Sequence, residues 1–131
     1  MKKKYFLSDI KNLKIEVSKP SLIFLRGDLG AGKTTLTKHI INDILGINKE
    51  VISPTYTYYN TYEDVVHFDL YRLKNYDEFF AIGWEDVLDN NTGVVIIEWP
   101  ELIEKYYTPD IDIKILPWEV EDERELEILS K

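Results

Sequence analysis

The chain has 131 residues, and from this length we expect a single domain over residues 1–131 with little room for a separate substrate-binding domain. It carries 24 acidic and 16 basic side chains, which give a formal net charge of −8. This charge argues against a groove that follows a nucleic-acid backbone, because neutralising phosphates requires clustered lysine and arginine. The sequence has no cysteine, no apolar stretch of membrane-spanning length and no signal-peptide pattern, which predicts a cytoplasmic protein that is indifferent to redox state.

The N-terminal segment gives a weak signal. Residues 1–4, MKKK, form the only basic run, and we expect them to be a solvated terminus. The segment LSDIKNLKIEV at residues 7–17 is typical of a short helix opened by Ser8 or Asp9. Its later β-branched residues also suit a strand, so the pattern leaves both alternatives open.

The most specific motif follows. The pattern GxxxxGK(S/T) is satisfied by Gly27, Gly32, Lys33 and Thr34. The apolar run SLIFL at residues 21–25 precedes it, and LTKHIINDIL at residues 36–45 carries apolar side chains at helical spacing. Gly46 is suited to end that helix in the left-handed conformation. The order of strand, glycine-rich loop and helix predicts a phosphate-binding loop (P-loop).

The residue types of this loop explain its chemistry. Glycines let the backbone N–H groups surround phosphate oxygens, and the following helix directs its positive end at them. We expect Lys33 to reach the outer phosphates and the Thr34 hydroxyl to ligate Mg²⁺. A glycine-rich turn without a ligand is the alternative, which the flanking strand and helix disfavour.

Strands and helices alternate along the rest of the chain. Tyrosine and threonine alternate up to Tyr62, and residues 65–68 return as a second strand after a turn. The segment at residues 75–88 is typical of a helix that is capped by Asn75 and broken near Gly83.

The C-terminal part predicts three further strands. GVVIIEWP at residues 93–100 is a continuous apolar run, as expected for a strand buried on both faces. DIDIKIL at 110–116 and ELEIL at 125–129 alternate and should pair antiparallel around a turn at 121–123. The fold class is therefore α/β: a single-domain P-loop NTPase with a mixed parallel and antiparallel sheet flanked by helices, whose ligand binds at the carboxyl ends of the strands.

Two predicted strands end in a carboxylate. VVHFD delivers Asp69 and VVIIE delivers Glu98, and a P-loop enzyme needs such a group near its magnesium ion. Either carboxylate could hold the ion while the other orients the attacking water, or each could simply mark the end of a strand. His67 is interpreted as a strand histidine with satisfied hydrogen bonds, because Asp69 already fills the carboxylate role.

Two other classes of P-loop protein fit the sequence less well. A GTPase needs a guanine-reading NKxD segment late in the chain, whereas the only Asn-Lys pair lies early, at residues 48–49. A small-molecule kinase usually clamps its second substrate with several arginines, and this chain has only Arg26, Arg72 and Arg124. The kinase stays open as the alternative to an ATPase.

Five motifs together carry a resemblance to a known family. They are GDLGAGKTTL (27–36), SPTYT (53–57), HFDLYRL (67–73), IGWED (82–86) and IEWPE (97–101). In this order and spacing the chain resembles the TsaE (formerly YjeE) family, the bacterial ATPases needed to make threonylcarbamoyladenosine on tRNA. The resemblance covers residues 21–130, and the joint occurrence of the motifs is far more specific than any one of them.

The resemblance implies a site for ATP and Mg²⁺. The residues that match nucleotide-binding positions are the P-loop and an arginine near the base or ribose: Asp28, Leu29, Gly30, Ala31, Gly32, Lys33, Thr34, Thr35 and Arg124. Thr34 and Glu98 match the residues that approach Mg²⁺. Asp69 matches the aspartate needed for ATP hydrolysis, for which Lys33 contacts the outer phosphates.

The resemblance also implies a switch segment and a tryptophan beside the active site. SPTYT resembles the segment that senses the γ-phosphate, with Ser53 or Thr55 as candidate hydroxyls. Trp99 matches the tryptophan, although a core tryptophan that ends a buried strand is an equally good interpretation. An aromatic stripe is formed by Tyr56, Tyr58, Tyr59 and Tyr62. It either stacks on bases or packs on the face of a hairpin, and the acidic charge favours packing.

Protein partners are the last implication of the resemblance. TsaE proteins act with TsaD and TsaB to transfer a threonylcarbamoyl group to the adenosine next to the anticodon, and the ATPase is thought to reset that complex between turnovers. We therefore expect ATP and Mg²⁺ as cofactors, TsaD and TsaB as partners, and no groove for direct tRNA binding. A nucleotide-dependent switch with negligible turnover is a third possibility.

Overall fold

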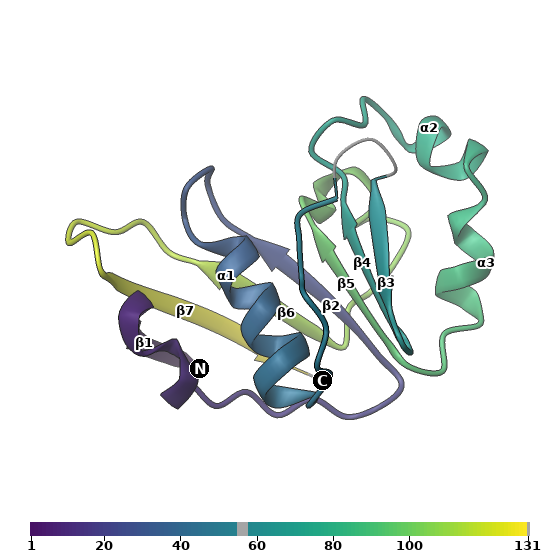
Figure 1. The fold of residues 1–131 in the computed structure, drawn as a ribbon. Coiled ribbons are helices and arrows are strands. Elements are labelled where there is room, and N and C mark those ends of the chain that lie inside the picture. The colour runs from purple at the N-terminus through teal and green to yellow at the C-terminus, as the bar shows by residue number, and fades with distance from the viewer. Residues whose placement is uncertain (55–57, 131) are drawn as a thin grey trace.

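A seven-stranded mixed sheet forms the centre of the computed structural model, which describes residues 1–54 and 58–130 (Figure 1). Its strands are β1 (Lys2–Phe6), β2 (Ser21–Arg26), β3 (Tyr59–Tyr62), β4 (Val65–Asp69), β5 (Val94–Glu98), β6 (Ile111–Ile115) and β7 (Glu123–Ser130). Their order across the sheet is β1-β7-β6-β2-β5-β4-β3. β6, β2, β5 and β4 run parallel, while β3, β7 and β1 are added antiparallel. The predicted α/β fold with a mixed sheet is confirmed.

Helical segments cover both faces of this sheet. They are η1 (Leu7–Asn12), α1 (Lys33–Lys38), η2 (His39–Ile44), α2 (Tyr76–Ala81), α3 (Trp84–Asp89) and η3 (Pro100–Leu102). α1 and its π-helical continuation η2 pack Leu36 and Ile40 against Ile96 on one face. α2 packs Phe79 against Phe24 on the opposite face. Within the described residues, no helix is both long and apolar enough to span a membrane.

The parallel strands explain why the long apolar runs are buried. β5 is buried at every position because strands flank it on both sides and helices cover its faces. In the register, Glu98 lies beside Leu25 of β2 and beside Asp69 of β4. The carboxyl ends of β2, β5 and β4 therefore lie next to one another, and the P-loop begins at the end of β2.

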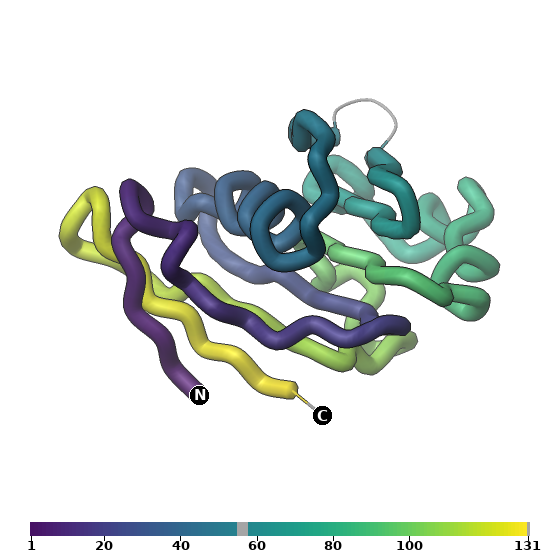
Figure 2. The backbone as a smooth tube through the Cα atoms, turned by 60° about the horizontal axis from the view of Figure 1, so that its bottom comes forward, coloured from purple at the N-terminus to yellow at the C-terminus, as the bar shows by residue number. Residues whose placement is uncertain are grey.

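The N-terminal prediction is wrong in part. The basic segment continues into β1, an edge strand that pairs antiparallel with β7. Two of its three lysines lie opposite glutamates, with Lys2 beside Glu127 and Lys4 beside Glu125, and such opposite-charge pairs stabilise neighbouring strands. Figure 2 shows β1 and β7 side by side, with both chain termini at the same end of the sheet.

The helix option for residues 7–17 is correct only for the first half. η1 is a 3₁₀-helix that begins at Leu7, after Phe6 rather than at a Ser8 or Asp9 cap. The following residues form no strand, but Leu13 and Ile15 are buried in the core beside α1. Their apolar alternation reflects this packing of a non-helical segment.

The remaining local predictions are confirmed. β3 and β4 form the expected hairpin, in which Tyr62 is buried and Tyr59 packs against Trp84. The Asn75 side chain accepts a hydrogen bond from the backbone N–H of Glu78 and caps α2. Gly83, at φ +82°, separates α2 from α3. These two tyrosines of the aromatic stripe therefore pack in the hairpin, while Tyr56 lies outside the described residues.

Candidate nucleotide site

The P-loop connects the end of β2 to α1. Gly30 at φ +80° and Gly32 at φ +102° adopt the left-handed conformation that side-chain-bearing residues avoid. At Gly27, an added Cβ would lie 3.2 Å from the Cβ of Ile115 and 3.3 Å from the Cβ of Ala31. The backbone conformation therefore favours glycine at positions 30 and 32, while tight side-chain packing favours it at position 27.

Lys33 is held at the mouth of this loop. Its Nζ donates hydrogen bonds to the backbone oxygens of Gly27 (2.5 Å) and Asp28 (3.0 Å) and lies 4.3 Å from the ring centre of Trp99. Burial lowers the pKa of Lys33, and the charges of Glu98 and other nearby carboxylates oppose that shift. The ammonium group is thus desolvated, which strengthens its attraction for an anion.

Two predicted hydroxyl residues come together. The Oγ1 of Thr34, in the first turn of α1, lies 2.9 Å from the Oγ of Ser53. Ser53 belongs to the segment predicted to act as a switch, so that segment is linked directly to a candidate magnesium ligand. The other candidate hydroxyl, Thr55, lies outside the described residues.

The two carboxylates lie side by side but have different surroundings. Glu98 is 2% exposed, and its Oε2 lies 2.5 Å from the Nε2 of His67. Asp69 is partly exposed, and its Oδ1 accepts a hydrogen bond from the backbone N–H of Tyr71. Burial raises the pKa of Asp69, and the neighbouring Glu98 adds to the shift. The structure therefore distinguishes a deeply buried carboxylate from a more accessible one.

These side chains offer oxygen donors of the kind that Mg²⁺ prefers. Hydroxyl oxygens come from Thr34 and Ser53, and carboxylate oxygens come from Asp69 and Glu98. Among the described residues, no group of three or more His, Cys, Asp or Glu side chains is arranged to hold a metal ion by itself. Mg²⁺ in nucleotide sites is usually held by one or two carboxylates together with phosphates and water. The donor set fits an ion that is bound together with phosphates.

Trp99 follows β5 and lies beside the P-loop. Its backbone has φ +58°, and its ring centre is 4.9 Å from that of Tyr71. It is half-buried and contacts Lys33. It therefore lies at the candidate site rather than inside the core.

Arg124 of β7 is hydrogen-bonded to the backbone of the P-loop. This buried side chain donates from Nε to the backbone oxygen of Ala31 (2.8 Å) and from Nη1 to the oxygens of Glu121 (2.7 Å) and Glu123 (2.8 Å). Its guanidinium group stacks 4.1 Å from the ring centre of Trp118. Arg124 therefore ties the connection between β6 and β7 to the P-loop backbone.

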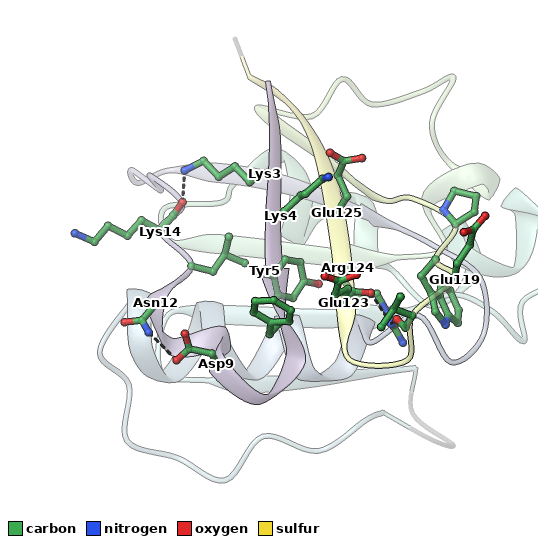
Figure 3. Close-up of a pocket in the computed structure, with 15 residues that line it drawn as sticks. Lys3, Lys4, Tyr5, Asp9, Asn12, Lys14, Glu119, Glu123, Arg124 and Glu125 are labelled. Carbon is green, nitrogen blue, oxygen red and sulfur yellow. Dashed lines mark hydrogen bonds between the residues drawn. The ribbon is translucent and has the colours of Figure 1, made fainter.

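A cavity of about 770 Å³ lies next to Arg124. Figure 3 shows lining side chains from β1, η1, the connection into β7 and β7 itself, among them Tyr5, Asp9 and Glu119. Tyr5 carries a buried hydroxyl, and burial raises its pKa to about 12. This cavity is roomy enough for a small organic ligand, since such pockets measure roughly 300–1,000 Å³.

The sequence alone did not predict the contact between His67 and Glu98. His67 is a buried strand histidine whose Nε2 is hydrogen-bonded, as predicted, but the sequence did not identify Glu98 as the partner, and Nδ1 has no partner in the described residues. Alternation along β4 puts His67 and Asp69 on the same face, so the pattern HxD carried a signal. The contact itself depends on the pairing of β4 with β5, which no local pattern reveals.

Comparisons with known proteins agree with these features. The family model described as threonylcarbamoyl adenosine biosynthesis protein TsaE matches residues 5–126. The tRNA threonylcarbamoyladenosine biosynthesis protein TsaE of Haemophilus influenzae is 37% identical over 123 residues, covering 91% of this chain and 76% of that protein. Its counterpart in Rickettsia felis is 39% identical over 102 residues, covering 72% of this chain and only 58% of the longer relative.

The fold has a counterpart among solved structures. A crystal structure of Bacillus subtilis YdiB superposes with a TM-score of 0.66 at 30% identity, covering 96% of this chain and 82% of that one. The family match over residues 5–126 includes the P-loop and both strand-end carboxylates. The chain therefore belongs to the TsaE family of threonylcarbamoyl adenosine biosynthesis proteins.

Proposed function

We propose that the protein is a Mg²⁺-dependent ATPase that serves threonylcarbamoyl modification of tRNA and acts with TsaD and TsaB rather than on tRNA directly. The observation that carries the proposal is the meeting of Lys33, Thr34, Asp69 and Glu98 at one edge of the sheet. Phosphoryl transfer depends chiefly on positioning and charge neutralisation, which these groups can supply. The family assignment supports the pathway.

The phosphates of ATP would lie on the P-loop. Within residues 1–54 and 58–130, the hydrogen bonds of Lys33 go to the backbone oxygens of Gly27 and Asp28, so its ammonium group can turn to the outer phosphates without breaking an ion pair seen there. The backbone from Asp28 to Thr35 provides the surrounding N–H groups. Arg124 fixes Ala31 from below, and the adjoining cavity leaves space for the nucleoside end.

Thr34 and Glu98 would hold the magnesium ion. Mg²⁺ supplies charge neutralisation at the phosphates when it is bound. Asp69 is the more accessible carboxylate, and its raised pKa makes it a better proton acceptor for the attacking water. Ser53 is hydrogen-bonded to Thr34, and this bond would break or reorient when Thr34 binds the magnesium ion. The switch segment, which also contains Thr55, would in this way respond to the γ-phosphate.

The dependence on partners follows from the arginines. Arg26 is held by Glu104 (2.5 Å) and Asp112 (2.8 Å), and Arg124 by backbone oxygens. Arg72 is exposed and close in sequence to Asp69. Rapid phosphoryl transfer often relies on an arginine at the γ-phosphate, so a partner protein would supply this charge or bring Arg72 into place.

The experiment is a steady-state ATPase assay of the purified chain with and without Mg²⁺. Removing the Lys33 charge or the Thr34 hydroxyl should reduce turnover by about 100-fold or more, while the thermal midpoint of the apo-protein should stay close to that of the wild type. Lys38→Ala, at an exposed position of α1, is the control and should hydrolyse ATP normally.

Two results would contradict the proposal. Wild-type turnover in Lys33→Ala or Thr34→Ala would show that the P-loop is not the site of hydrolysis. A metabolite that accelerates ATP consumption with no protein partner present would instead establish the small-molecule kinase.

A further inference from the structure

The proposed ATPase mechanism gives no role to His67, although this histidine is buried next to a carboxylate of the candidate site. His67 lies in the middle of β4 and is 0% exposed. Its Nε2 lies 2.5 Å from Oε2 of Glu98, a side chain that is itself 2% exposed. Its Nδ1 is buried and has no hydrogen-bond partner within the described part of the chain. A histidine that served only to fill space would need neither the contact nor the unpaired nitrogen.

The contact identifies which ring nitrogen acts on Glu98. Nε2 faces a carboxylate oxygen, and an ionised carboxylate only accepts hydrogen bonds, so Nε2 is the donor. Nδ1 is buried and has no hydrogen-bond partner in the described residues. The geometry therefore makes His67 a hydrogen-bond donor to Glu98 through Nε2.

We propose that His67 is a positioning residue that fixes the carboxylate of Glu98 for magnesium binding. Because the bond from Nε2 engages Oε2, the other oxygen, Oε1, would stay available as a ligand. This inference rests on the proposed role of Glu98 as a ligand. Partners that hold a metal ligand in this way typically change metal affinity about 10–100-fold when they are removed.

The register explains why the position must be occupied by a donor. Glu98 lies opposite Asp69, so His67 is its diagonal neighbour on the same face of the sheet. Long side chains can meet across such a diagonal. Glu98 has no other hydrogen bond among those found for the described residues, so a purely apolar side chain at position 67 would leave its carboxylate without a donor.

Two substitutions separate positioning from space filling. His67→Gln places an amide nitrogen near the position of Nε2 and retains a donor, whereas His67→Leu fills a similar volume without one. The affinity for ADP is measured by titration calorimetry across a series of Mg²⁺ concentrations and again in EDTA. We expect His67→Leu to raise the Mg²⁺ concentration required about tenfold or more, with metal-free ADP binding unchanged. His67→Gln should stay within about threefold of the wild type.

A second measurement uses the unaltered protein. Long-range ¹H–¹⁵N spectra of the imidazole groups report which nitrogen carries the proton, and the chain has only two histidines, so His39 serves as the internal reference. We expect Nε2 of His67 to carry a proton. This readout requires neither a substitution nor activity, and therefore holds even where a variant fails to fold.

Three results would overturn the inference. They are an unchanged Mg²⁺ requirement in His67→Leu, an equal loss in both variants, and an Nε2 without a proton in the wild-type protein. Failure of the proposed function is recognised separately, because the wild type would then bind ADP without any effect of Mg²⁺ while Nε2 of His67 would still carry its proton.

Discussion

At the scale of single residues, the site depends on how differently two adjacent carboxylates are placed. Glu98 is enclosed and bonded to His67, whereas Asp69 is partly exposed and bonded to a backbone N–H. An enclosed carboxylate with a fixed partner suits a ligand whose orientation must not vary, and an accessible one with a raised pKa suits proton transfer. This contrast supports the different roles that we propose for the two carboxylates.

The first prediction separates these roles. Glu98→Gln should weaken Mg²⁺-dependent nucleotide binding about tenfold or more, because it removes a charged ligand. Asp69→Asn should leave binding within a few-fold and reduce hydrolysis about 100-fold or more, because a positioned base typically contributes 10²–10⁴-fold. Binding by calorimetry and single-turnover hydrolysis are measured on both variants. The reverse pattern would exchange the roles of Asp69 and Glu98.

The sequence predicts much of this site because its residues are close along the chain. Gly32, Lys33 and Thr34 lie within one motif, and their geometry follows from the loop that the motif encodes. The bond between His67 and Glu98 joins residues that are 31 positions apart, and it depends on strand pairing. Arg124 is a similar case, because its bond to Ala31 spans 93 positions. Long-range partners of this kind leave no periodic signal.

At the scale of elements, apolar patterns predict the central strands well and the edge poorly. β5 is an unbroken apolar run because it is buried on both faces. β1 has four basic or exposed positions out of five residues and is held by its partner β7. Edge strands are commonly charged, since this discourages pairing with other chains. The same charge makes them resemble a solvated terminus.

A close approach between two elements gives the second prediction. An added Cβ on Gly93, which directly precedes β5, would lie 1.9 Å from the backbone oxygen of Asp64 in the β3–β4 turn. Gly93→Ala must therefore displace the backbone and should lower the free energy of unfolding by about 2 kcal/mol or more. Urea denaturation measures this loss.

The matched control is Gly46→Ala. Gly46 has φ +71° but no atom within 4 Å of an added Cβ, so only the backbone strain of about 1 kcal/mol applies. Equal losses at the two positions would mean that Gly93 does not make the close approach to Asp64 in solution.

At the scale of the whole molecule, the candidate site and several exposed apolar side chains lie together at the carboxyl ends of the central strands. Leu29 of the P-loop is 64% exposed, Ile52 beside the switch segment 57% and Tyr71 after β4 54%. The opposite end of the sheet, where β7 ends, exposes Leu129 at 60%. Apolar side chains gathered around a site are typical of a surface that contacts another protein. Together with the limited supply of arginines, this favours an ATPase completed by its partners.

The last prediction is that the isolated chain hydrolyses MgATP slowly. Adding TsaD with TsaB should raise the rate of hydrolysis about tenfold or more, because an arginine supplied by another protein can contribute about 10³–10⁵-fold. Ile52→Ala should reduce this stimulation more than it reduces nucleotide binding, because the side chain is exposed beside the switch segment. Leu129→Ala, equally exposed at the opposite end of the sheet, should be stimulated like the wild type. Rapid turnover without partners, or equal stimulation of all three proteins, would place the partner surface elsewhere or remove the need for it.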